Sequence, residues 1–298
     1  EPYFAYLKVA EGCDNRCSYC AIPLIRGPFR SRPMENIVAE AQRLAACGVT
    51  ELNVAAQDTT RYGEDLYGRL ALPELLEKLC RLDGVRWVRM LYCYPDRITD
   101  RLLDVMAREE KIVKYMDIPI QHVNGRILSL MNRRGDAGSL TALMEKIRAR
   151  VPGVVLRTTL ITGFPTETQG EFEELCEFVQ RVRFERLGCF AYSAEEDTPA
   201  ALMDGQLDEE EKRRRAQIIM EQQYGVMEGF NRSQIGRLTV AVEGREGRLW
   251  YGRSYMDAPD IDSRVYFSGH GPYSPGDYIE VEIDGVEGYD LKGKALNK

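Results

Sequence analysis

Short apolar runs alternate with amphipathic stretches over the first two thirds of the chain, and this alternation restricts the possible folds more than any other feature. Such runs are typical of strands in a parallel sheet, and the amphipathic stretches are typical of the helices that cover it. The runs predict strands at Phe4 to Ala10, Glu51 to Ala55, Trp87 to Tyr92, Tyr115 to Ile120, Val155 to Thr162 and Leu187 to Tyr192. The stretches predict helices at Met34 to Cys47, Pro73 to Leu82, Thr99 to Glu109, Gly125 to Met131, Ser139 to Arg150 and Thr168 to Val182. Six such units predict an α/β fold, an open partial (β/α)6 barrel that is TIM-like but too short to close with eight strands.

The last third of the chain has a different pattern. One long polar helix is predicted at Asp208 to Phe230, and period-two strands separated by glycine and proline follow it. These strands are Leu238 to Glu243, Arg248 to Tyr255, Arg264 to Ser268, Tyr278 to Ile283 and Asp290 to Ala295. Five short strands predict a small all-β, OB-like barrel. We therefore expect one domain over residues 1–233 and a second over residues 234–298, with the boundary near Ser233.

Three cysteines follow the first predicted strand, where functional side chains of parallel barrels gather. Cys13, Cys17 and Cys20 have the spacing C-x3-C-x2-C, and no fourth cysteine or histidine lies nearby in the sequence. A four-iron cluster takes four thiolates, so a triplet leaves one iron open to a small molecule. Structural zinc remains an alternative, but it is usually held by two separated pairs of ligands, and the sequence has no second pair. The other five cysteines are scattered, which is typical of buried free thiols.

Charge and composition restrict the setting and the partners. The chain has 298 residues and a net charge of -7, which is the wrong sign for affinity based on phosphate neutralisation. No apolar segment approaches the roughly 20 residues of a membrane span, so we expect no membrane partner and a cytoplasmic location. The chain begins at Glu1 without an initiator methionine, so we expect it to be part of a longer protein.

The cysteine triplet, with Tyr19 before its last cysteine, resembles that of the radical S-adenosylmethionine (radical SAM) enzymes. The run Arg26 to Pro33 is similar to one in the methylthiotransferase branch, and Gln57 to Thr60 resembles the aspartyl, RimO-type members more than the tRNA-modifying, MiaB-type members. Two further runs also match this family: Pro119 to His122, and Arg157 to Glu167 with Thr166 in place of a usual glycine. In the tail, Gly252-Arg253 and Asp257 to Asp262 are similar to the TRAM domain that ends these enzymes.

The resemblance implies a role for particular residues, although it assigns no catalytic residue. It implies that Cys13, Cys17 and Cys20 hold a 4Fe-4S cluster with an open iron site. Contacts to S-adenosylmethionine are implied for Tyr19, Gln57, Gln121, Arg157 and Glu167. Roles in the loops or toward the substrate are implied for Arg26, Arg30, Arg32, Asp58 and His122. Each of the last two groups also has a plain structural interpretation, such as a strand-end turn, a helix N-terminal carboxylate or a solvated loop.

The implied activity is transfer of a methylthio group to the beta carbon of an aspartate in a small-subunit ribosomal protein, with an electron donor. The family holds a second 4Fe-4S cluster on an N-terminal domain, which we expect this chain to lack. Residues 231–298 contain nine Lys and Arg against eleven Asp and Glu, which favours a basic ribosomal protein over tRNA as the partner. A tRNA adenosine methylthiotransferase and a non-catalytic metal-binding, ribosome-associated module remain the alternatives.

Overall fold

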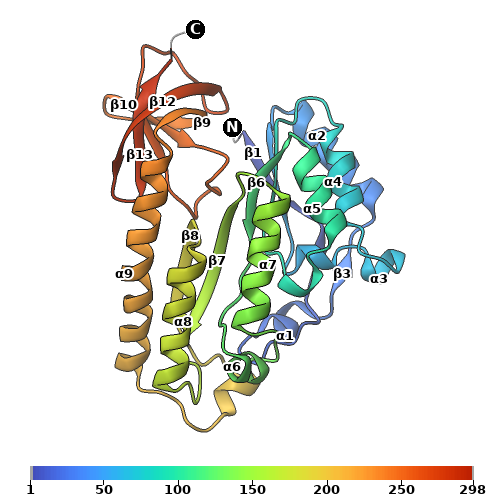
Figure 1. Ribbon diagram of the computed structural model, residues 1–298. Coiled ribbons are helices and arrows are strands. Elements are labelled where there is room, and N and C mark those ends of the chain that lie inside the picture. Colours follow the sequence, from blue (N-terminus) through green and yellow to red (C-terminus); the bar gives the residue numbers. More distant parts are fainter. Residues whose placement is uncertain (1–2, 297–298) are drawn as a thin grey trace.

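A six-stranded parallel sheet forms the centre of the computed structural model, which describes residues 3–296 (Figure 1). The strand order is β1-β4-β5-β6-β7-β8, so β1 and β8 are the two edges. The bounds are β1 Phe4–Lys8, β4 Glu51–Ala55, β5 Trp87–Met90, β6 Ile112–Asp117, β7 Val155–Thr162 and β8 Arg186–Ala191. The sheet does not close on itself, which confirms the partial barrel expected from the sequence.

Helices follow the strands and cover the outer face of this sheet (Figure 1). Apolar side chains on their inner faces, such as Ile37, Leu76 and Leu103, join outward-facing strand residues in one large core. The long helices are α2 Met34–Ala46, α4 Leu72–Cys80, α5 Asp100–Arg108, α7 Ala137–Arg150 and α8 Gln169–Val182, with the short α1 Ile22–Arg26, α3 Glu64–Tyr67 and α6 Gly125–Leu130. Three 3-10 helices lie at Thr59–Arg61, Pro95–Arg97 and Pro199–Leu202. No helix of residues 3–296 is long and apolar enough to cross a membrane.

Four of the six predicted sheet strands differ from the observed ones. The third ends two residues earlier, at Met90, and the sixth is shifted by one residue, to Arg186–Ala191. The first ends at Lys8, because the chain then forms β2 (Ala10–Glu11), which pairs with β3 (Arg30–Ser31) instead of the sheet. The fourth, β6, begins three residues earlier than predicted and ends at Asp117. Ile112 already pairs with Val88 of β5, and Pro119 has no N–H to continue the ladder.

The tail follows one long helix and is a closed barrel of five strands, as the sequence predicted. Helix α9 (Glu209–Ser233) begins after the cap of Asp208, whose carboxylate accepts from the Glu210 amide, and runs beside β8 and α8. The barrel strands are β9 Gly236–Glu246, β10 Leu249–Arg253, β11 Val265–Ser268, β12 Tyr278–Glu287 and β13 Asp290–Ala295, in the order β10-β11-β13-β12-β9.

The tail barrel packs against the amino-terminal ends of the sheet strands (Figure 1). Trp87 and Tyr115 of the sheet share a second core with Val240 and Phe267 of the barrel. The cysteine loop lies at the opposite, carboxyl-terminal ends of the strands. The two ends of the sheet are therefore divided between the tail barrel and the cysteine loop.

Candidate functional site

The cysteine loop begins at Gly12, directly after β2. Gly12 has φ +79°, and a Cβ there would lie 2.2 Å from the carbonyl oxygen of Pro28. Cys13 donates its amide to the Gly27 oxygen at 3.1 Å, and the Phe29 amide donates to Asp14 Oδ1. Only glycine fits this crossing of two backbone segments, so the position of Cys13 depends on it.

The other end of the loop is bound to helix α6. Ser18 donates its amide to Met131 O and its hydroxyl to Leu130 O, at 3.0 and 2.7 Å. Asn132 Nδ2 donates to the carbonyls of Asn15 and Arg16. The loop is thus held from both sides by hydrogen bonds that involve no cysteine side chain.

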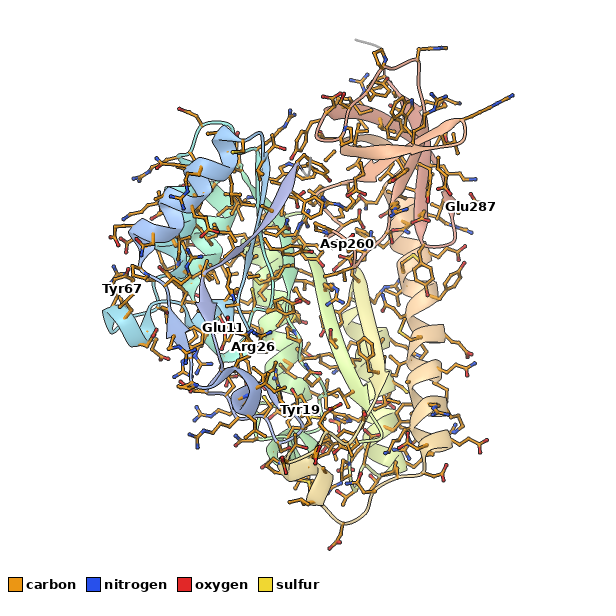
Figure 2. The ribbon with its side chains drawn as sticks, turned by 180° about the vertical axis from the view of Figure 1, so that it is seen from behind. Glu11, Tyr19, Arg26, Tyr67, Asp260 and Glu287 are labelled. Atoms are coloured by element: carbon orange, nitrogen blue, oxygen red, sulfur yellow. The ribbon has the colours of Figure 1, made fainter. Side chains whose placement is uncertain are left out.

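Cys13, Cys17 and Cys20 are half-buried and line one cavity of about 270 Å³ (Figure 2 labels Tyr19 in the same loop). Burial raises the pKa of the Cys13 and Cys20 thiols. Four other residues predicted from the sequence also line this cavity, namely Tyr19, Gln57, Gln121 and Arg157. The three cysteines predicted to bind a cluster and four residues predicted to contact the cofactor therefore line the same cavity, although they are up to 144 positions apart in the chain.

The donor set fits an iron-sulfur cluster better than a single metal ion. Within residues 3–296, no three Cys, His, Asp or Glu side chains converge as the ligands of one ion. Zinc needs its sulfur ligands about 2.3 Å from a single centre, whereas a four-iron cluster binds each thiolate at a different iron. Three separate thiols around one cavity match the second arrangement.

Two amide groups in the cavity have unused hydrogen-bonding capacity. The Oε1 atoms of Gln57 and Gln121 are buried and have no partner among the described residues. Gln121 and Tyr92, which also line the cavity, have left-handed backbones with φ +70° and +58°. Such conformations cost about 1–3 kcal/mol each and cluster at ligand sites. Both acceptors suit a ligand that carries ammonium or hydroxyl donors.

Arg133 is a site residue that the sequence did not reveal. It is buried, its Nη1 lies 3.7 Å from Cys17 Sγ and 3.4 Å from the Tyr19 hydroxyl, and its Nη2 donates to Pro119 O. Burial acts to lower the pKa of Arg133, but Tyr19 and Cys17 outweigh it and raise the pKa. Arg133 lies 113 residues beyond Cys20, so no motif in the sequence linked it to the cysteines. The one available clue was its position shortly after α6, because the end of α6 holds the cysteine loop.

Arg157 lines the cavity and is fixed by two carboxylates. Its Nη1 donates to Asp117 Oδ1 at 2.8 Å, and its Nε lies 3.5 Å from Asp262 Oδ1 in the tail. Asp262 also accepts from the Tyr115 hydroxyl at 2.6 Å, and burial raises the pKa of Asp262. Arg157, which the sequence predicted as a cofactor contact, therefore also links the cavity to the tail domain.

Asp58 lies behind the cavity rather than in its wall. It is fully buried, caps the 3-10 helix Thr59–Arg61, and accepts from Asn15 Nδ2 at 2.9 Å and Arg97 Nη1 at 3.2 Å. The structure shows it as a group that positions the cysteine loop through Asn15.

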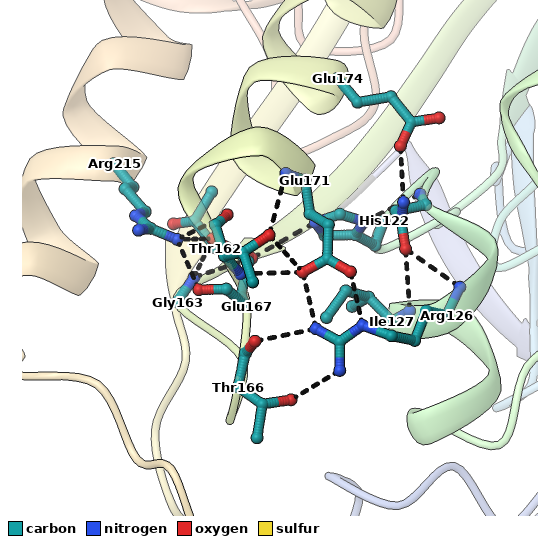
Figure 3. A network of polar contacts seen from close by, with 12 residues as sticks. His122, Arg126, Ile127, Thr162, Gly163, Thr166, Glu167, Glu171, Glu174 and Arg215 are labelled. Carbon is teal, nitrogen blue, oxygen red and sulfur yellow. Dashed lines mark hydrogen bonds and ion pairs between the residues drawn. The ribbon is translucent and has the colours of Figure 1, made fainter.

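His122 and Glu167 lie outside the cavity lining, in a buried network around α8 and α9 (Figure 3). Glu167 Oε2 is 3.3 Å from His122 Nε2, and both side chains are fully buried. Glu167 also accepts from the Gly163 amide and, at 2.6 Å, from Arg215 Nη1 of α9. The Glu167 carboxylate does not line the cavity with the other predicted cofactor contacts, because the Gly163 amide and Arg215 hold it by hydrogen bonds.

Thr166 occupies a position that favours glycine. Its φ is +68°, a strained value for a β-branched residue. Arg126 donates to the Thr166 hydroxyl and carbonyl at 3.0 and 2.8 Å, and the Thr166 amide donates to Gly205 (Figure 3). These contacts hold the turn even though glycine is absent.

The three loop arginines do not form a joint binding site. Arg26 Nε lies 3.8 Å from Glu11 Oε1, and Figure 2 labels these two residues next to each other. Arg30 donates to backbone carbonyls. Arg32 pairs with Glu40 at 2.5 Å. None of them lines the cavity beside the cysteines. Arg26 ends α1, Arg30 begins β3, and Arg32 follows β3.

Comparisons with known proteins show the families to which the two parts of the chain are similar. Residues 7–179 match the model of the radical SAM superfamily, and residues 235–296 match that of the TRAM domain. A curated relative from Pelotomaculum thermopropionicum is 51% identical over 99% of this chain and 67% of its own length. Another from Lachnoclostridium phytofermentans is 49% identical over 98% of this chain and 67% of its own length. Both are named ribosomal protein uS12 methylthiotransferase RimO, and the chain spans about two thirds of their length.

Solved structures show the same fold at low sequence identity. The radical S-adenosylmethionine methyltransferase TsrM from Kitasatospora setae has a TM-score of 0.55 and 17% identity, and the match covers 67% of this chain and 38% of TsrM. Coproporphyrinogen III oxidase from Escherichia coli, described as a radical SAM enzyme, has a TM-score of 0.52 and 19% identity, with 75% of this chain and 52% of the oxidase covered.

Proposed function

Because the chain belongs to the radical SAM superfamily and, within it, to the RimO family of methylthiotransferases, we propose that it adds a methylthio group to the beta carbon of an aspartate in ribosomal protein uS12. The observation that carries this proposal is the shared cavity of the three cysteines and the amides of Gln57 and Gln121. A metal site alone needs no unpartnered acceptors beside it, whereas a site that also binds a small polar cofactor does.

The residues of the cavity receive distinct roles in this proposal. Cys13, Cys17 and Cys20 bind a 4Fe-4S cluster, which supplies the electron that cleaves S-adenosylmethionine in this family. Tyr19 offers an aromatic face, while Gln57 and Gln121 accept hydrogen bonds from the cofactor. Arg157 offers guanidinium hydrogen-bond donors in the cavity wall, and its pairs with Asp117 and Asp262 fix its position.

The division into two domains at Ser233 is part of the proposal, with residues 234–298 in contact with the substrate. The matched TRAM region begins at residue 235, two residues after α9 ends. The net negative charge of this tail suits a basic ribosomal protein and opposes the tRNA alternative.

We also propose a second 4Fe-4S cluster on a part of the protein that this chain does not include. The remaining cysteines do not offer one: Cys47 is exposed directly after α2, Cys80 and Cys93 are buried at separate places, and Cys176 and Cys189 are half-buried. A reducing electron donor and a cytoplasmic location follow from the proposed chemistry and from a ribosomal substrate.

Anaerobic reconstitution with iron and sulfide, followed by a 5'-deoxyadenosine assay with dithionite, tests the cofactor half of this proposal. We expect a four-iron cluster and nucleoside product. An intact cluster that yields no nucleoside would support the non-catalytic module instead. For the substrate half, mass spectrometry of uS12 after incubation with the full-length protein should show the mass of one added methylthio group, and its appearance on tRNA alone would contradict the proposal.

Two cysteine variants form a matched pair for the cluster ligands. Cys17→Ala should lose the cluster, because two thiolates remain for a site that needs three. Cys47→Ala, at the exposed end of α2, should retain it. Retention of four irons in Cys17→Ala, measured by iron content and absorbance, would refute the ligand role.

A further inference from the structure

A second cavity, of about 540 Å³, lies between the edge strand β8, helix α9 and the tail loop of residues 260–263. Arg157 lines both this cavity and the cysteine cavity, so the two share a wall. Figure 2 shows Asp260 where the tail barrel meets the sheet, at the other end of the strands from Tyr19. The proposed function uses only the cysteine cavity.

A buried hydrogen-bond acceptor without a partner lines this second cavity. Gln223 of α9 is 2% exposed, and its Oε1 has no partner among the described residues. Its Nε2 donates to Phe184 O at 2.8 Å, which fixes the orientation of the amide because only the nitrogen can donate. The free oxygen therefore calls for a donor from a ligand, since an unsatisfied buried acceptor costs about 1–3 kcal/mol.

The charges around the cavity point to a cationic ligand. The Asp260 side chain forms no hydrogen bond or ion pair with any of residues 3–296, and among these residues the Asp290 carboxylate accepts only from the Arg264 amide. The two guanidinium groups in the wall are already neutralised, Arg157 by Asp117 and Asp262 and Arg186 by Asp257 at 2.8 Å. Uncompensated negative charge therefore remains on the cavity rim.

Apolar side chains cover the rest of the wall. Phe190 and Tyr289 are 61% and 46% exposed, and Met220 and Met227 of α9 lie beside Gln223. An arginine or lysine side chain matches this combination, because its aliphatic stem packs on apolar and aromatic groups while its head binds oxygen acceptors.

We infer that this cavity binds a cationic side chain, arginine or lysine, of the ribosomal protein substrate. The inference rests on the proposed function and adds the recognition of a basic residue near the target aspartate. Because Arg157 separates the two cavities, the basic residue would bind on one side of it while the target residue enters the cysteine cavity. Nucleic acid is a poor occupant, since its phosphates would meet Asp260 and Asp290.

A pair of synthetic peptides tests this inference by fluorescence anisotropy with the reconstituted protein. Both span the target aspartate of uS12; one carries arginine beside it, and the other carries the neutral isostere citrulline. We expect the arginine peptide to bind about tenfold more tightly, the value of one charge-assisted hydrogen bond. The double variant D260N/D290N should remove this difference, and the matched control D83N, an exposed carboxylate in the loop before β5, should keep it.

Each other result overturns the inference. Equal affinity for the two peptides would mean that the cavity does not bind a cationic side chain. The same conclusion would follow if D83N lowered the preference for the arginine peptide as much as D260N/D290N does. Displacement of the arginine peptide by spermidine at equal concentration would assign the cavity to a polyamine. Circular dichroism checks that D260N/D290N is folded; if it is not, the single variant D260N takes its place. If the unaltered protein forms neither 5'-deoxyadenosine nor methylthio product, the proposed function is refuted, whatever the peptide affinities are.

Discussion

At the scale of single residues, the cysteine loop depends on groups that are not ligands. Gly12 permits the close crossing with Pro28, Asp58 holds Asn15, and Arg133 reaches a cysteine sulfur. The spacing in the sequence predicted the three cysteines that line the cavity, but it could not predict Arg133, because the contact exists only after α6 packs against the loop. The sequence singled out Asp58 as a candidate loop or substrate residue, but only the structure shows that it caps the 3-10 helix Thr59–Arg61.

Arg133→Gln should make a bound cluster harder to reduce. Removing a buried positive charge 3.7 Å from Cys17 Sγ disfavours the added electron. A charge-assisted contact is worth about 1.5–3 kcal/mol, which corresponds to a midpoint potential lower by about 60 mV or more for one electron. Redox titration measures this shift. Arg134→Gln, the exposed neighbour, is the control, and an equal shift in both variants would contradict the role of Arg133.

Gly12→Ala should displace the loop and lower the iron content of the reconstituted protein several-fold. The new Cβ would meet the Pro28 backbone at 2.2 Å, in addition to the strain of φ +79°. Gly48→Ala is the matched control, because Gly48 has φ +96° but nothing within 4 Å of the new Cβ. If both variants load iron like the unaltered protein, the crossing does not control the site.

At the scale of elements, the pattern of apolar runs identified each strand of the sheet, while the ends of strands depended on partners. The apolar run before Gln121 continues through Ile118 and Ile120, so the sequence did not show that the strand ends at Asp117. Nor did it show that pairing with β5 begins at Ile112, because that depends on the partner strand. The sequence predicted the helix observed as α9, but it could not show that Arg215 faces Glu167, because a long polar helix has the pattern of a solvated surface. In the structure Arg215 is turned inward to Glu167, which closes off that carboxylate from the cavity.

Arg215→Ala should lower the free energy of unfolding by about 3–5 kcal/mol, because it leaves the Glu167 carboxylate buried without its cation. Urea denaturation measures the change. Arg214→Ala serves as the control, since Arg214 pairs with the same Glu211 but is 51% exposed, and we expect a change below about 1 kcal/mol. Adding Glu167→Gln to Arg215→Ala should recover part of the loss; no recovery would mean that packing rather than charge dominates.

At the scale of the whole molecule, a buried ion network joins the sheet to the tail barrel. Glu51 of β4 lies 3.0 Å from Arg89 of β5 and 2.8 Å from Arg253 of β10, and all three side chains are at most 2% exposed. Arg253 also binds Glu243 and the Tyr3 hydroxyl, both at 2.6 Å. The sequence predicted both domains, but their mutual placement rests on residues 202 positions apart.

Glu51→Gln should destabilise the protein near neutral pH and flatten its acid unfolding. Burial acts to raise the pKa of Glu51, but Arg89 and Arg253 outweigh it and lower the pKa below its usual range. The stabilisation is therefore present above the unfolded pKa of about 4.3 and is lost as pH falls through the lower folded value. Unfolding free energies between pH 7 and 3 test this. Glu282→Gln, at a surface pair with Arg237, should match the unaltered protein; a similar slope in Glu51→Gln would contradict the linkage.

The shared core at the amino-terminal end of the sheet has a consequence for protein engineering. A chimera that replaces residues 234–298 with a barrel from a different protein would remove Arg253, one of the two arginines that pair with Glu51, and would uncover Trp87 and Tyr115. Such a chimera should fail to express in soluble form unless the graft also supplies the arginine and the 254–262 loop. Although the two domains look like separable modules in sequence, only matched pairs of them can be exchanged.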